Sequence, residues 1–206
     1  MLRNSHLLNG FLTNSEAWYG LTNEDTNHLE QVDEILLRKI LEVPSSSPKC
    51  MLYLETGSKP IRFIIMARRL MFLHYILQED SSSLISKFFF AQDDQPLKND
   101  WALTCRKNLM ELSLDITLDE IKALSKQRFL NKVKTAVSKL ALTYLTVEKQ
   151  KLSKVLHITH SVLRLENYLL PKATTIQLAK FTFHARNRML DTIKHTQIYF
   201  ALCVKI

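Results

Sequence analysis

The chain has 206 residues, is 46% hydrophobic and carries a formal net charge of +8. This length and hydrophobic content exclude a disordered polyelectrolyte and allow one domain or two small ones. The charge is uneven, because residues 121–206 contain 16 basic and 3 acidic side chains, whereas residues 1–120 contain 12 and 17. Like charges repel one another in a compact state, so an excess of this size indicates a polyanionic partner. We expect RNA or DNA first, and an anionic membrane surface or an acidic protein next.

Turn-forming residues and cysteines are both sparse. Three glycines and five prolines leave few of the tight turns that sheets and phosphate-binding loops need. Cys50, Cys105 and Cys203 are odd in number and far apart, which argues against a disulfide framework and for an intracellular location, in the nucleus or cytoplasm. We therefore expect an all-α protein, an irregular multi-helix bundle of about six to eight helices with no substantial sheet.

The first predicted helix covers residues 23–43. Thr22 and Asp25 stand three apart, so each side chain can cap the other's backbone N–H. Residues 44–48 contain two prolines and three serines, which end the helix because proline cannot continue the hydrogen-bond ladder. The apolar series of this helix is Leu29, Val32, Leu36 and Ile40.

The next predicted helix is the most hydrophobic. It begins near Pro60, whose fixed φ suits a first turn, and runs to about Gln78. Its apolar residues nearly encircle the axis, so it needs partners on several sides. Charged residues interrupt it before about 20 apolar residues are reached, so we expect no membrane span. We then expect a short helix over 84–90, a polar surface loop over 92–100 and helical spacing over 101–112.

The last part of the chain is basic and helical. Thr117 and Glu120 form a second capping pattern ahead of a long amphipathic segment. Further helices are predicted over 155–170 and 178–193. The charge distribution divides the chain into an acidic-leaning half, 1–115, and a basic half, 116–206, or the two form one continuous domain. The predicted apolar stripe of the long segment consists of Phe129, Leu130, Val133, Val137, Leu140, Tyr144 and Val147.

The basic flank of this segment is the candidate binding site. Several phosphate contacts form at once when cations are spaced along a rigid element. Phe183, His184 and Tyr199 would stack on bases if they were exposed. The alternative is a solvated helical face whose Lys stems cover the edges of the core. The candidate residues are Arg128, Lys132, Lys139, Lys180, Arg186 and Arg188.

Motifs for catalysis or metal binding are weak. The FAQDD sequence at 90–94 invites comparison with the aromatic-Ala-Asp-Asp box of reverse transcriptases, but a Gln precedes the acids and a polar loop follows, so a solvated loop is favoured. His157 and His160 could chelate zinc, yet no third ligand lies at a usual spacing. Cys105 is interpreted as an inert, half-buried thiol. We expect no catalytic residue, no cofactor and no metal.

Short segments spread along the chain carry a family resemblance. They are NSEAWY at 14–19, LEQVDEILLRKIL at 29–41, LYLETG at 52–57, PIRFII at 60–65, RRL at 68–70, and AQ at 91–92 ahead of DW at 100–101. In this order, they resemble the region that follows the reverse-transcriptase palm in polyproteins of non-LTR retrotransposons. The likeness covers roughly residues 5 to 195 and rests on many short matches, with no catalytic signature among them.

The resemblance implies a helical thumb and linker that grips template and primer. The parent polyprotein would be an RNA-directed DNA polymerase whose carboxylates precede Met1. A zinc knuckle would begin near Cys203, which cannot bind structural zinc alone. We therefore expect a fragment or decayed copy, truncated at both ends, that is not an enzyme. It would bind RNA or DNA backbone, as an RNA/DNA duplex or a single strand, without sequence readout.

Three alternatives stay open at this stage. The helix over 60–78 could dock on a partner helix, which would make the chain an interaction module or allow self-association. An active polymerase or nuclease would need converging carboxylates, Asp93 among them. A translated relic without a selected role would aggregate, because the same apolar helix would lack its partner.

Overall fold

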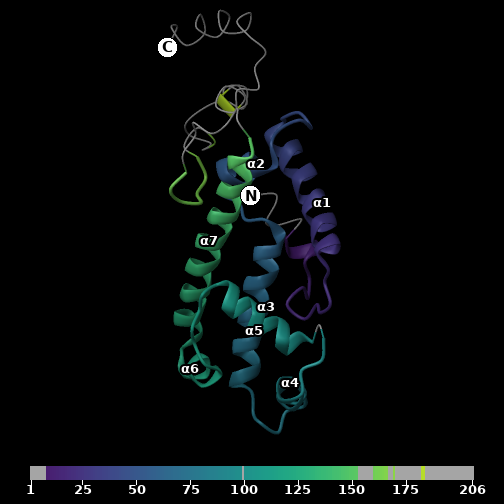
Figure 1. Cartoon of the computed structure of the whole chain (residues 1–206), viewed down its shortest axis with the longest axis vertical. Coiled ribbons are helices and arrows are strands. Elements are labelled where there is room, and N and C mark those ends of the chain that lie inside the picture. Colours follow the sequence, from purple (N-terminus) through teal and green to yellow (C-terminus); the bar gives the residue numbers. More distant parts are fainter. Residues whose placement is uncertain (1–7, 99, 153–159, 167–168, 170–181, 184–206) are drawn as a thin grey trace, which may run out of the picture. The chain divides into compact units, whose positions relative to one another are not determined.

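The computed structural model describes residues 8–98, 100–152, 160–166, 169 and 182–183. Within these residues the chain is all-α, with no β-strand, so the predicted fold class is confirmed. Figure 1 shows the helices along the chain. Their bounds are α1 Asn23–Leu41, α2 Lys49–Thr56, α3 Ile61–Gln78, α4 Leu84–Asp94, α5 Trp101–Glu111, α6 Leu118–Ala123 and α7 Lys126–Gln150.

The chain forms two compact units, and each is discontinuous in sequence. The first consists of Met1–Leu37 and Lys59–Tyr144, and the second of Arg38–Ser58 and Leu145–Ile206. The halves predicted at residue 115 are defined by charge, and they stay a prediction.

Helix α3 is the centre of the first unit. Helices α4, α5 and α6 all pack on it (Figure 1). Ten of its residues are buried, from Ile61 at one end to Leu77 at the other, and the exposed aromatic residue is Tyr75. A helix that is apolar almost all round is thus covered within its own chain. The side of α3 that carries Phe72 and Tyr75 stays partly open.

Helix α7 packs antiparallel to α3. Phe63, near the start of α3, makes an edge contact with Tyr144, with ring centroids 5.6 Å apart. His74, near the end of α3, stacks on Phe129, with ring centroids 5.3 Å apart. Since residue numbers rise along α3 as they fall along α7, these two contacts fix both the direction and the register of the pair.

Arginines of α3 hold the segment that precedes α1. Arg68 donates hydrogen bonds to the carbonyl oxygens of Leu8, at 2.8 Å, and of Leu12. Arg69 donates from Nη2 to the carbonyl oxygen of Trp18, at 3.0 Å. The side chain of Leu12 is fully buried and clusters with Ile61 and Ile65. These contacts satisfy carbonyl groups in a segment that consists of a π-helical turn at residues 8–11 followed by turns.

Helix α1 begins where predicted but faces the other way. The Thr22 hydroxyl accepts from the Asp25 backbone N–H at 3.1 Å, and the Asp25 carboxylate accepts from the Thr22 N–H at 2.9 Å, which confirms the cap. The predicted apolar face is not the buried one, because Val32 is 42% and Ile40 41% exposed. The four buried residues of the helix are Glu30, Asp33, Glu34 and Leu37.

The bond between α1 and α3 gives the physical reason for this orientation. Arg62 donates from Nε to one carboxylate oxygen of Glu30, at 2.7 Å, and from Nη2 to the other, at 3.0 Å. Such a two-point ionic contact is directional, whereas the apolar contacts of Val32 or Ile40 are not. The acidic face of the helix therefore turns inward.

In the second unit, α2 is a helix that the sequence pattern did not predict. Its residues 50–55 are all buried, so it shows no amphipathic period. Gly57 ends it with φ +62°, and a Cβ there would meet backbone atoms of Arg164 at 2.2 to 2.6 Å, so only glycine fits. The Glu166 N–H donates to the carbonyl oxygen of Glu55 at 2.9 Å.

The helix predicted over 155–170 is wrong where the structure tests it. Residues 160–166 are not helical, with bends at 161 and 162, and the backbone N–H of Glu166 donates to Glu55 of α2. The helix predicted over 178–193 lies outside the described residues, apart from a short helical stretch at 182–183.

Candidate nucleic-acid interface

Helix α7 begins at its own cap. Leu124 ends α6 in an extended conformation, and the Ser125 hydroxyl then accepts from the backbone N–H of Arg128 at 3.4 Å. The Thr117–Glu120 capping box was predicted, but it starts the short α6 and not the long basic helix. From Lys126 to Val147, α7 carries five cations and no carboxylate.

A buried stripe fixes which face of α7 points outward. It recurs at every fourth residue: Phe129, Val133, Val137, Ala141 and Leu145, each at most 1% exposed. Of the predicted stripe, Leu130, Leu140 and Tyr144 are only half-buried, and Val147 is 49% exposed. Because an α-helix has 3.6 residues per turn, residues spaced by four shift by about 40° around the axis at each step. The buried row therefore departs from the straight apolar stripe that was predicted.

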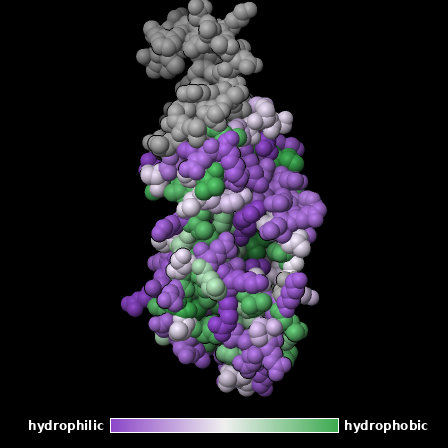
Figure 2. Space-filling view, viewed as in Figure 1, coloured by the Kyte–Doolittle hydropathy of each residue, from purple (hydrophilic) through white to green (hydrophobic). Residues whose placement is uncertain are grey.

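Three predicted site residues share the outward face. Arg128, Lys132 and Lys139 are exposed, and at 100° per residue they fall within about 40° of one another. At 1.5 Å per residue they span about 16 Å of helix, which is the rise of about five base pairs. Among the described residues, none of the three forms an ion pair with a carboxylate. In Figure 2, hydrophilic residues project from the edge along which α7 runs in Figure 1.

The other predicted site residues are not tested. Lys180, Arg186 and Arg188 lie outside the described residues, as do His184 and Tyr199. Phe183 is 1% exposed, so the exposure on which its stacking on a base depends is not present. An aromatic ring must present a face to solvent before a base can cover it.

A groove beside α7 was missed by the sequence reasoning. It has a volume of about 890 Å³, and Lys126 and Lys134 line it from α7. On the α3 side lie Phe72 and Tyr75, which stack with ring centroids 5.9 Å apart and planes 10° apart. Tyr75 is 51% exposed, although it sits in the most apolar helix, and the sequence carries no signal for this exposure.

Carboxylates border these cations at three points. Glu120 lies near Lys132, and hydrogen bonds from Thr117 lower its pKa. Glu16 lines the groove. A hydrogen bond with Glu79 raises the pKa of the Tyr75 hydroxyl, which stays neutral at physiological pH. Glu16 and Glu79 thus lie on the groove side, and Glu120 lies beside Lys132 of the outward face.

The residues with catalytic potential have structural roles. The 90–94 motif forms the last turn of α4, so the predicted loop at 92–94 is wrong, and no strand hairpin surrounds the acids. Asp93 is paired through both carboxylate oxygens with Arg106 of α5. Burial raises the pKa of Cys50 to about 11 and that of Cys105 further still. Among the described residues, no three His, Cys, Asp or Glu side chains gather closely enough to hold a metal ion.

Comparisons with known proteins find no match to this chain among protein families, curated sequences or solved structures. In the part of the chain that the structure describes, no helix combines the length and the hydrophobicity that crossing a bilayer requires.

Proposed function

We propose that the outward face of α7 binds the sugar–phosphate backbone of nucleic acid without reading sequence. The observation that carries the proposal is the row of Arg128, Lys132 and Lys139, exposed on one side of one rigid helix and free of described ion pairs. Each phosphate contact releases condensed counterions, and that release supplies the affinity.

The groove beside α7 extends this proposal to unpaired nucleotides. Lys126 and Lys134 would meet phosphates at its edge, and the exposed ring of Tyr75 would stack on a base. Stacking is tolerant of sequence because every base has a π-face. The combination favours a junction of duplex and single strand as the bound form.

The same proposal includes an origin and the absence of catalysis. The resemblance to the thumb and linker of non-LTR retrotransposon polyproteins would set such a basic helix against a template–primer duplex. The carboxylate that a catalytic role would need, Asp93, is already held by Arg106. The chain would then bind the template–primer duplex, and a separate polymerase would catalyse the reaction.

Fluorescence anisotropy with labelled duplexes tests the proposal. Two RNA/DNA hybrids of unrelated sequence would be titrated with the protein between about 50 and 200 mM salt. We expect equal affinities for both and a linear fall of log affinity with log salt, with a slope of about −3 or steeper because each contact contributes about −0.9. An affinity that does not change with salt, or that differs widely between the two sequences, would refute the proposal.

A further inference from the structure

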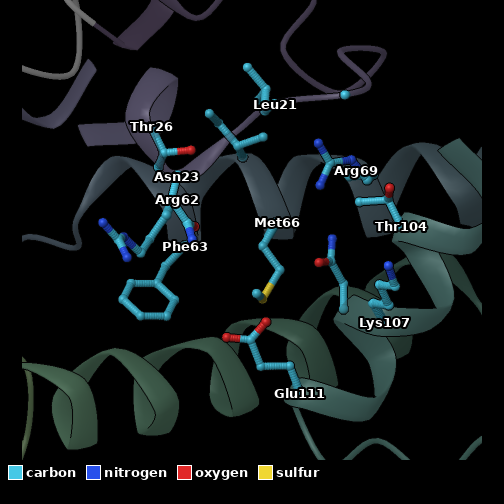
Figure 3. A pocket seen from close by; sticks show the side chains of 13 residues that line it. Leu21, Asn23, Thr26, Arg62, Phe63, Met66, Arg69, Thr104, Lys107 and Glu111 are labelled. Atoms are coloured by element: carbon cyan, nitrogen blue, oxygen red, sulfur yellow. The ribbon is translucent and has the colours of Figure 1, made fainter. Parts of the chain in front are cut away.

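A second pocket in the first unit is lined by two buried donor groups. It has a volume of about 350 Å³ and lies between the start of α1, the middle of α3 and α5. Figure 3 shows Arg69, Thr104 and Lys107 at one end of it, and Arg62 and Phe63 at the other. Asn108 also lines the pocket.

Arg69 is a buried cation with an unused donor. Its side chain is 6% exposed, and although Nη2 donates to the Trp18 carbonyl, Nε is buried without a hydrogen-bond partner among the described residues. Burial lowers the pKa of Arg69, yet a guanidinium stays protonated in proteins. A buried charge without a counterion is unfavourable, so an anion at this position would be favoured.

The chain does not provide that anion within the described residues. Cys105 lies close to Arg69, but burial raises its pKa far above neutrality, so it remains an uncharged thiol. Asp93 is paired with Arg106, and Glu30 with Arg62. Glu111 also lines the pocket, and its carboxylate points toward Met66 (Figure 3), but it is an exposed residue and forms no described ion pair with Arg69.

Asn108 provides a second donor from the facing helix. It is 7% exposed, and its Nδ2 is buried without a hydrogen-bond partner among the described residues. Lys107, the preceding residue, is exposed and adds a positive charge at the pocket. A guanidinium, an amide N–H and an ammonium group are the donors with which proteins hold carboxylates and phosphates.

We propose that this pocket binds the anionic oxygen group, a carboxylate or a phosphate, of a small molecule. On binding, the side chains of Arg69 and Asn108 turn so that their buried donors, Nε and Nδ2, meet the anionic oxygens, and Lys107 attracts the ligand to the entrance. The apolar side chains of Leu21, Phe63 and Met66 receive the remainder of the ligand. The volume is in the range of small-molecule sites. This site is separate from the α7 face and does not depend on the proposed function.

Thermal unfolding with three probes tests the site. Inorganic phosphate, adenosine monophosphate and succinate would each be added to the full chain at about 0.1 to 20 mM, and a ligand that binds the native state raises the midpoint. We expect at least one of them to do so in a saturable manner. A larger rise of the midpoint with phosphate and the nucleotide than with succinate would identify the bound group as a phosphate, and the reverse would identify it as a carboxylate. A larger rise with the nucleotide than with inorganic phosphate would show that the organic part of the ligand contributes to binding. No rise with any of the three would overturn the proposal.

Two variants assign the effect to the pocket. Asn108→Asp places a carboxylate of the same shape beside Arg69, so the variant should unfold at a higher temperature and bind the anion at least about tenfold more weakly. Arg69→Met removes the charge for an apolar side chain of similar length and should keep the fold while abolishing the response. Gln95→Glu, in an exposed loop, adds the same charge elsewhere and should respond as the wild type does.

Other outcomes are equally informative. An unchanged response in Arg69→Met would overturn the proposal, whether or not Asn108→Asp folds. The variant Arg128→Gln/Lys132→Gln/Lys139→Gln should keep the full response to the small anion. Loss of the response in that variant would place the anion on α7 and refute the pocket, leaving the proposed function intact.

Discussion

The imidazole of His74 stacks on the phenyl ring of Phe129, with ring centroids 5.3 Å apart and planes 19° apart. The Nε2 of the same His74 donates to the carbonyl oxygen of Leu124 at 2.9 Å, where α6 ends. One turn later on α3, Gln78 donates to the carbonyl oxygen of Lys122 at 2.6 Å. Two side chains of α3 thus satisfy the end of α6 and position the start of α7, and the cations of α7 depend on this arrangement.

Replacement of the buried ring tests this arrangement. Phe129→Ala should lower the free energy of unfolding by about 3–5 kcal/mol, because it leaves a cavity and removes the stacking partner of His74. Urea titration followed by circular dichroism measures the change. Leu84→Ala is the control, since Leu84 is 83% exposed and its loss should cost less than about 0.5 kcal/mol. Equal effects of the two substitutions would contradict the packing described.

Local signals were sufficient to predict several helix ends. Both reciprocal caps, at Thr22 with Asp25 and at Thr117 with Glu120, form as the spacing indicates. These patterns need only residues three apart, so no tertiary information is required. The start of α3 after Pro60 belongs to the same class.

The remaining differences come from tertiary contacts. Helix α2 has no apolar period because residues 50–55 are all buried, and Gly57 was the one local sign of its end. The break between α6 and α7 depends on His74, which is 50 residues distant from the carbonyl that it satisfies. Helix α1 turns its acidic face inward through a bond to Arg62, which is 32 residues beyond Glu30. None of these partners can be found by periodicity alone.

The two caps predict an acid-dependent loss of stability. Hydrogen bonds from Thr22 and Thr117 lower the pKa of Asp25 and Glu120 from 3.8 and 4.5. A lowered native pKa stabilises the folded state above the unfolded-state value, and this contribution is lost as the pH falls through the native value. The variant Asp25→Asn/Glu120→Gln should therefore be less stable than the wild type near neutral pH, with the difference closing on acidification.

Urea midpoints between about pH 6 and pH 2.5 measure this effect. The control is Asp94→Asn/Asp115→Asn, which removes two exposed carboxylates for which the structure shows no cap. Its difference from the wild type should not close in the same window. A gap between the cap variant and the wild type that stays constant down to the lowest pH would contradict the assignment of the caps.

Burial of the thiols predicts chemical inertness. The pKa of Cys50 is raised to about 11, so about one molecule in a thousand carries the thiolate at pH 8, and Cys105 carries less. In a Cys203→Ser background, a disulfide reagent should label neither thiol of the native protein and both after unfolding in guanidinium chloride. Thr135→Cys, on the exposed surface of α7, should react within minutes. Rapid labelling of Cys50 or Cys105 in the native state would show that these helices open.

One of the two candidate sites could be predicted from the sequence, and the other could not. The row of Arg128, Lys132 and Lys139 follows from the helical period, and its exposure agrees with the prediction. The anion pocket could not be predicted, because Arg69 and Asn108 are polar residues buried on two separate helices. Their spacing of 39 residues carries no signal until the fold brings α3 and α5 together.

The salt dependence of duplex binding by a charge-matched pair of variants tests the central claim most directly. One variant is Arg128→Gln/Lys132→Gln/Lys139→Gln. The other is Lys39→Gln/Lys87→Gln/Lys98→Gln, which removes three exposed cations from other parts of the chain. We expect the first to reduce the log–log slope by about 2 to 3 and the second to leave it near the wild-type value. Equal slopes for the two variants would show that net charge alone, and not the outward face of α7, holds the nucleic acid.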